Sequence, residues 1–149
     1  MPIIKLKKSV VPSCDVDSLE KLSKLVKATC SVKGIGAYKI GFELVIPFGM
    51  ENVVKTIRKH TKLPIIYDHQ KAGTDIPEMG SKFMSACKLA DAVILFPQAG
   101  PETEAAWIKS AQQAKMNVII GGEMTHRAYL KEAGGFIDDN APKRMYEIA

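Results

Sequence analysis

The sequence predicts an α/β protein whose strands form a parallel sheet. Short apolar runs alternate five times with helical patterns along the 149 residues, and only a few residues connect them. Such alternation is typical of repeated βαβ units, in which each helix returns the chain to the next parallel strand. No linker or low-complexity stretch interrupts the pattern, so one domain over residues 1–149 is expected. Periodicity alone leaves an open doubly wound sheet and a β/α barrel as alternatives.

Each predicted strand is a short apolar run followed by turn or charged residues. The first helix starts from Ser18, and its leucines recur at helical spacing. Pro101 lies in the first turn of a later helix, where its missing N–H removes no hydrogen bond. Thr125 is expected to cap a short helix that runs to about residue 131. The predicted strands are 9–14, 37–41, 63–67, 92–96 and 117–122, and the other helices are predicted at 49–60, 76–90, 101–115 and 142–149.

The composition is that of a soluble globular domain. Hydrophobic residues make up 46% and charged residues 25% of the chain. No apolar run approaches the roughly 20 residues that a membrane-spanning helix needs, so no membrane association is expected. The N-terminus carries charge without a long apolar segment behind it, which argues against a secretory signal. We therefore expect a cytoplasmic protein.

The net charge of +5 suits an anionic partner. Only Lys5, Lys7 and Lys8 cluster, and few aromatic residues accompany them, so no nucleic-acid partner is expected. A phosphate-bearing small molecule, or solubility alone, explains the charge as well. The cysteines Cys14 and Cys30 and the more distant Cys87 show no paired spacing, which favours reduced thiols over disulfides or a zinc site.

The most informative stretch is residues 66–77, Ile-Tyr-Asp-His-Gln-Lys-Ala-Gly-Thr-Asp-Ile-Pro. It places Asp68, Lys71 and Asp75 between the end of a predicted strand and the next predicted helix. In a β/α barrel this is the end of the strands at which active sites lie. A lysine between two carboxylates stays charged and can deliver a proton to a developing carbanion. The alternative is a solvated loop with ordinary surface charges.

This stretch resembles the signature of orotidine 5'-phosphate decarboxylases, Asp-x-Lys-x-x-Asp-Ile at the end of the third strand. The chain has one more residue than the signature in each of the two gaps between these charged residues. Other strand ends match the family as well. Asp15 follows the first strand, Lys39-Ile40-Gly41 lies in the second, and Glu123-Met124-Thr125-His126 follows the fifth.

The resemblance implies a (β/α)8 TIM-type barrel, with about the first five to six β/α units present in this chain. It implies cofactor-free decarboxylation of orotidine 5'-phosphate to uridine 5'-phosphate in de novo pyrimidine biosynthesis. Lys71 would protonate C6 of the pyrimidine as carbon dioxide leaves, and Asp75 would reach the active site of the other subunit of a homodimer. The implied catalytic residues are Lys39, Asp68, Lys71 and Asp75, and the implied substrate-binding residues are Asp15, Ile76, Met124 and Thr125.

Lys39 distinguishes this chain from related sugar-phosphate decarboxylases and aldolases. Those enzymes carry a glutamate on the second strand that helps to bind magnesium, whereas a lysine repels a divalent cation. No metal is therefore expected.

A complete (β/α)8 barrel usually needs about 200 residues or more. The segments that supply the phosphate-binding loops in the family have no counterpart in the 149 residues. The chain is therefore expected to be a fragment, to be completed by a partner, or to close its gap by self-association. The alternative functions are a non-catalytic module that keeps the pocket of the superfamily and a related sugar-phosphate decarboxylase or aldolase.

Overall fold

Four parallel strands form the centre of the structure, a computed structural model that describes residues 2–70 and 72–149. The strands are β1 (Tyr38–Gly41), β2 (Ile65–Asp68), β3 (Ala92–Leu95) and β4 (Asn117–Ile120), and they lie side by side in sequence order. A doubly wound sheet reverses its strand order near the middle, whereas a β/α barrel adds each strand beside the last. The order β1-β2-β3-β4 is therefore that of a partial barrel, as predicted.

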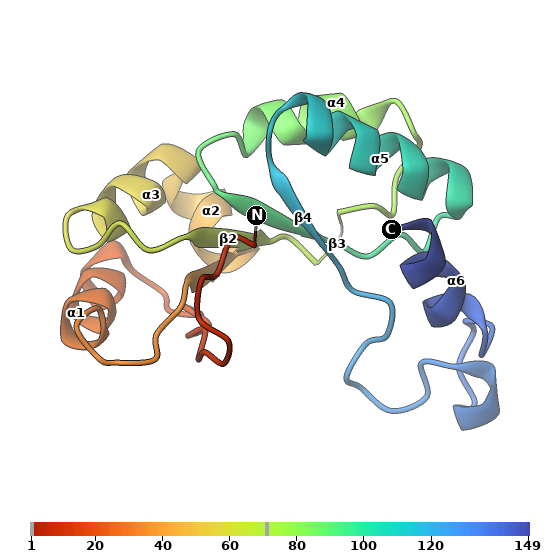
Figure 1. The fold of residues 1–149 in the computed structure, drawn as a ribbon, viewed down its shortest axis with the longest axis horizontal. Coiled ribbons are helices and arrows are strands. Elements are labelled where there is room, and N and C mark those ends of the chain that lie inside the picture. Colours follow the sequence, from red (N-terminus) through yellow and green to blue (C-terminus); the bar gives the residue numbers. More distant parts are fainter. Residues whose placement is uncertain (1, 71) are drawn as a thin grey trace.

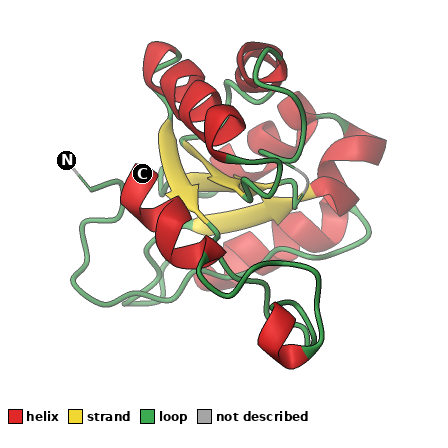
Figure 2. Cartoon of the chain, turned by 90° about the vertical axis from the view of Figure 1, so that its right-hand side faces the viewer, coloured by secondary structure: helices red, strands yellow, loops and turns green. Residues whose placement is uncertain are grey.

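The helices cover the outer face of this sheet. Figure 1 shows α3, α4 and α5 along one side of the strands, with α1 at one end of the row and α6 at the other. In the turned view of Figure 2, helices lie above, below and to the right of the strands, loops run along the left, and a loop with a short helical turn extends away at the bottom. The helices are α1 (Leu19–Thr29), α2 (Phe42–Phe48), α3 (Met50–Arg58), α4 (Met79–Ala86), α5 (Pro101–Gln113) and α6 (Ala141–Ile148), with a 3-10 turn η1 (Lys131–Ala133).

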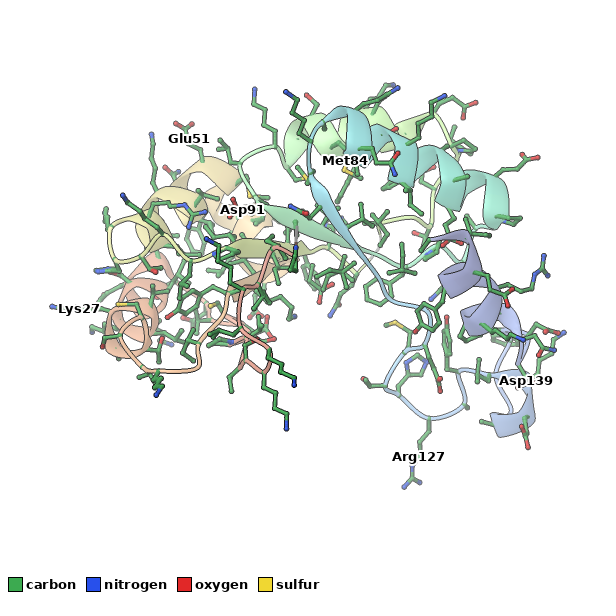
Figure 3. All side chains as sticks on the ribbon, in the orientation of Figure 1. Lys27, Glu51, Met84, Asp91, Arg127 and Asp139 are labelled. Atoms are coloured by element: carbon green, nitrogen blue, oxygen red, sulfur yellow. The ribbon has the colours of Figure 1, made fainter. Side chains whose placement is uncertain are left out.

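The main hydrophobic core lies between the sheet and the helices. Side chains alternate between the two faces of a strand, so Tyr38 and Ile40 of β1 point to the same side. They are fully buried together with Leu22 of α1 and Ile57 of α3. Met84, also buried, lies on the side of α4 that faces the sheet (Figure 3). Burying side chains of this size contributes about 1.5–3 kcal/mol each.

A smaller cluster lies on the inner face of the sheet, toward the start of the strands. Ala37, Ile66 and Ala92 are buried there, and Ile3 and Ile4 of the N-terminal segment pack against them. This packing closes the N-terminal end of the partial barrel and leaves the opposite, C-terminal end for the polar side chains that follow each strand.

The first predicted strand is present only as two parallel bridges, between Val10 and Ile35 and between Ser13 and Lys39. The backbone N–H of Cys14 also donates to the carbonyl of Lys39, over 2.8 Å. This segment has β1 on one side only, so fewer hydrogen bonds hold it in a regular strand. It still follows the direction of β1 and forms the edge of the sheet.

Two helix predictions need correction. The predicted helix 49–60 is preceded by a further helix, α2, and Gly49 separates it from α3 with a φ of 76°. The predicted helix 125–131 is wrong, because residues 121–130 form an irregular loop. Ala128 has a φ of 56° within this loop, which a right-handed helix does not allow. Arg127 of the loop projects away from the rest of the chain (Figure 3).

No helix among residues 2–70 and 72–149 is long and apolar enough to span a membrane.

Candidate functional site

An ion pair between Lys39 and Asp68 lies at the C-terminal end of the neighbouring strands β1 and β2. The Lys39 Nζ atom lies 2.9 Å from Asp68 Oδ2, and the side chains are 20% and 9% exposed. β1 and β2 pair in a register that sets Gly41 beside Asp68, so Lys39 is two residues back on the neighbouring strand. Residues two apart on a strand share a face, and the long lysine side chain spans the diagonal. The fold therefore brings together two of the predicted catalytic residues.

The two carboxylate oxygens of Asp68 differ in their contacts with the described residues, since only Oδ2 pairs with Lys39. Its Oδ1 atom is buried and has no hydrogen-bond partner among the described residues. A buried acceptor favours a hydrogen-bond donor beside it, because leaving it without a partner costs about 1–3 kcal/mol.

The ion pair borders a small cavity of about 260 Å³. Asp15 reaches this cavity because the bridge between Ser13 and Lys39 holds the N-terminal segment against β1. A Cβ atom on Gly41 would lie 3.6 Å from Asp15 Oδ1, an ordinary van der Waals distance, so Asp15 lies directly beside the end of β1. The residues that line the cavity are Asp15, Lys39, Gly41, Phe42, Glu43, Asp68 and Gln70.

The loop after β2 carries the other predicted catalytic residues. Gln70 has a φ of 64°, a left-handed conformation that is uncommon outside glycine and is concentrated at functional sites. Lys71, the predicted proton donor, lies outside the described residues. The backbone N–H of Phe96 donates to the Ala72 carbonyl over 2.7 Å, so β3 holds the loop directly after this position.

Asp75 and Ile76 do not reach the cavity around Lys39 and Asp68 within one chain. They border a separate cavity beside the start of α5, and the Ile76 side chain is 59% exposed. The Asp75 carboxylate accepts a hydrogen bond from the Ile76 N–H over 2.7 Å. Both side chains therefore lie on the surface, and the expectation that a second subunit receives them stays a prediction.

Met124 and Thr125 lie in the loop after β4, apart from the cavity around Asp68. Met124 is half-buried and Thr125 is exposed. The neighbouring Tyr129 is buried and donates its hydroxyl to the Gly122 carbonyl, which anchors the loop to the end of β4. Their predicted contact with substrate stays a prediction.

His69 turns away from the cavity and packs among aromatic side chains. Its Nδ1 atom lies 2.6 Å from the Tyr67 hydroxyl, and its ring contacts Tyr67 and Phe83. Burial lowers the pKa of His69, and the negative charge of Asp68 partly opposes this shift.

The lowered pKa of His69 predicts a pH-dependent stability. In the unfolded chain His69 binds a proton as the pH falls below its ordinary pKa of 6.5, whereas in the folded chain it does so only at lower pH. The free energy of unfolding therefore decreases as the pH falls from about 6.5 toward the lowered pKa of the folded state. We expect His69→Gln to lose less stability than the unmodified chain in urea denaturation between pH 7 and pH 5. The same change at the exposed His126 is the control, and equal slopes for the unmodified chain and His69→Gln would contradict the prediction.

The cysteine nearest the site is inert. Burial, together with the neighbouring Asp15, raises the pKa of Cys14 to about 12, with Lys39 acting in the opposite direction. The thiol therefore stays protonated at neutral pH and is a poor nucleophile. Cys14, Cys30 and Cys87 are all free thiols, as the sequence predicted.

Within the described part of the chain, no three His, Cys, Asp or Glu side chains lie close enough together to hold a metal ion.

Sequence reasoning left Glu43 as either pocket-lining or surface, and the structure places it at the cavity. It missed Gln70, which also lines the cavity and whose position directly after β2 could have indicated this. Glu104 of α5 is only 1% exposed, and its Oε1 atom has no partner among the described residues. Nothing in its sequence surroundings signals this burial, because it depends on how α5 packs.

Glu104 provides a test of buried charge. Burial raises its pKa, so the ionised form is unfavourable in the folded protein at neutral pH. We expect Glu104→Met to stabilise the protein at pH 7 by about 1 kcal/mol or more, with the gain shrinking as the pH falls toward the ordinary value of 4.5. Thermal denaturation beside the exposed control Glu102→Met measures this, and a destabilised Glu104→Met protein would show that the carboxylate has a partner.

Comparisons with known proteins agree with the fold of this chain. Two crystal structures of orotidine 5'-monophosphate decarboxylase from Methanocaldococcus jannaschii, one complexed with the inhibitor BMP, superpose with TM-scores of 0.80 and 0.79 at 24% sequence identity. Both structures match 95% of this chain. The chain spans 62% of the length of the solved chain in the inhibitor complex and 65% of the other. A search of curated proteins gave no match.

The family comparison covers nearly the whole chain. Residues 8–146 match the family described as "Orotidine 5'-phosphate decarboxylase / HUMPS family". This match includes the cavity, the loop after β2 and the loop after β4. The chain belongs to the orotidine 5'-phosphate decarboxylase / HUMPS family.

Proposed function

We propose that this chain carries the active site of an orotidine 5'-phosphate decarboxylase, which converts orotidine 5'-phosphate to uridine 5'-phosphate and carbon dioxide. The observation that carries the proposal is the ion pair between Lys39 and Asp68, which shares a cavity with Asp15 at the C-terminal end of the strands. A decarboxylase of this kind needs fixed charges around a carboxylate that leaves and a carbanion that forms.

The roles follow from the charges. Asp68 lies against the departing carboxylate, and Lys39 holds it in place through the 2.9 Å ion pair. Because both groups are fixed before the substrate arrives, they need little reorganisation as charge moves in the transition state. Lys71 donates the proton that C6 of the pyrimidine gains, and Asp15 binds the ribose. None of these steps requires a cofactor.

The homodimer is part of the proposal. Asp75 and Ile76 lie on the surface of one chain, away from the cavity that contains Asp68. Such a pair of side chains can complete the site of a second copy. Met124 and Thr125, in the loop after β4, contact the pyrimidine in this account. The cytoplasm, where pyrimidine nucleotides are made, is the proposed location.

The family description also covers HUMPS enzymes, and Lys39 favours the decarboxylase over them. Lys39 stands where the related sugar-phosphate enzymes are expected to carry a magnesium-binding glutamate. A cation at this place disfavours a divalent metal ion by charge repulsion.

Calorimetric titration with uridine 5'-monophosphate tests the proposed binding site. We expect micromolar binding by the unmodified chain and at least about tenfold weaker binding by Asp15→Asn, because a hydrogen bond to a charged group is worth about 1.5–3 kcal/mol. Asp17→Asn is the matched control, since Asp17 is exposed and pairs with Lys21 outside the cavity. Absence of binding by the unmodified chain would favour a non-catalytic module.

A further inference from the structure

Two side chains of α5 bind consecutive carbonyl groups of the loop that carries Asp75. The Thr103 hydroxyl donates to the Asp75 carbonyl over 3.0 Å, and the Trp107 indole N–H donates to the Ile76 carbonyl over 3.1 Å. Thr103 and Trp107 are four residues apart, so they lie one above the other on one face of the helix. This face of α5 therefore binds two successive peptide groups of the loop through hydrogen bonds.

Both donors are rigidly held. Thr103 and Trp107 are buried, and the Trp107 ring packs against Phe83 of α4 at a centroid distance of 5.3 Å. A Cβ atom on Gly80 would lie 3.0 Å from the indole ring, so the ring packs closely against the backbone of α4. A buried donor in a fixed position makes a stronger hydrogen bond than one exposed to water.

Both hydrogen bonds are made to the backbone of the loop, and the side chains of Asp75 and Ile76 are left exposed. Ile76 projects into solvent although α5 holds its carbonyl. The Asp75 carboxylate is turned back onto the Ile76 N–H, which restricts the aspartate as well. The result is a rigid backbone that presents an aspartate and an isoleucine outward, which a freely moving loop would not do.

We propose that Trp107 and Thr103 are positioning residues for the decarboxylation reaction. They act through Asp75 and Ile76, which they hold in the conformation that reaches the active site of a second copy of the chain. This inference rests on the proposed function. The inference adds that α5 sets the position of the shared aspartate. Thr103 and Trp107 lie 28 and 31 residues further along the chain than the residues whose carbonyl groups they bind.

Hydrogen exchange tests the anchor without relying on activity. Trp107→Phe keeps an aromatic ring and removes the N–H, and Thr103→Val keeps the shape and removes the hydroxyl. We expect amides of residues 74–80 to exchange faster in both variants. Lys109→Ala is the control, because Lys109 lies on the same helix and is exposed. Unchanged exchange in both variants would overturn the anchor.

A double-mutant cycle tests the positioning role. Trp107→Phe should lower kcat about threefold to tenfold, as expected for the loss of one hydrogen bond. In an Asp75→Asn background, Trp107→Phe should cause little further loss, since it acts through Asp75. Equal losses in both backgrounds would overturn the positioning role and point to a general effect on the fold.

The two experiments separate this inference from the proposed function. If the unmodified chain does not turn over orotidine 5'-phosphate, the catalytic role of α5 fails together with the proposed function. The exchange experiment then still decides whether α5 holds the loop. If turnover is present and exchange is unchanged, only the inference about α5 fails.

Discussion

Replacing Lys71 with alanine is expected to abolish turnover of orotidine 5'-phosphate and to leave the fold intact. In the proposed mechanism Lys71 delivers the proton to C6, and a positioned general acid contributes about 10²–10⁴-fold to the rate. In the same proposed mechanism its positive charge offsets those of Asp68 and of Asp75 from a second copy, so its loss would remove electrostatic stabilisation as well. We expect the rate to fall by at least about 10³-fold.

The measurement is initial-rate kinetics beside circular dichroism and thermal denaturation of the same preparations. Lys82→Ala is the matched control, because Lys82 is an exposed lysine on α4, the helix that follows the loop. Near-normal activity of Lys71→Ala would refute its role as proton donor. A fall in activity that accompanies unfolding would show instead that Lys71 serves the fold.

Replacing Lys39 with methionine is expected to cost about 2–3 kcal/mol of stability, because the nearly buried Asp68 carboxylate would lose its ion pair with Lys39. The same change should remove activity. In contrast, the double variant Lys39→Met with Asp68→Leu should recover most of the lost stability, since apolar pairs often replace buried ion pairs without loss.

The double variant separates stability from function. If the ion pair exists for catalysis, the double variant is folded, close to the unmodified chain in urea denaturation, and inactive. If the double variant is as unstable as Lys39→Met alone, the pair contributes to the fold itself. The exposed pair between Lys55 and Glu51 on α3 is the control, because its removal should change stability by less than about 1 kcal/mol.

The strands at the centre of the sheet could be predicted from the sequence because their side chains are buried on both faces. β2 is the clearest case, since all four of its residues are buried. The segment around Ser13 was harder to predict, because it lies at an edge and forms only isolated bridges. α2 was missed because its residues are largely apolar and include Pro47. The loop after β4 was misread as a helix because its local pattern does not show the left-handed conformation of Ala128.

The candidate site was predictable where it depends on strand ends. Asp15, Lys39 and Asp68 were predicted from the resemblance to the decarboxylase family, with Asp15 and Asp68 after the first and third strands and Lys39 within the second, and the structure brings them to one cavity. The support of the loop after β2 was not predictable. It depends on Tyr67 meeting His69 and on Trp107 meeting Ile76, contacts that arise only when α4 and α5 pack on the sheet.

The most direct test of the central claim is whether the purified 149-residue chain consumes orotidine 5'-phosphate, followed by the loss of its absorbance and the appearance of uridine 5'-phosphate. Turnover by the unmodified chain, absent from Asp68→Ala prepared in the same way, is the result that we predict. No turnover by the unmodified chain, or equal turnover by both preparations, would contradict the claim that this cavity performs the reaction.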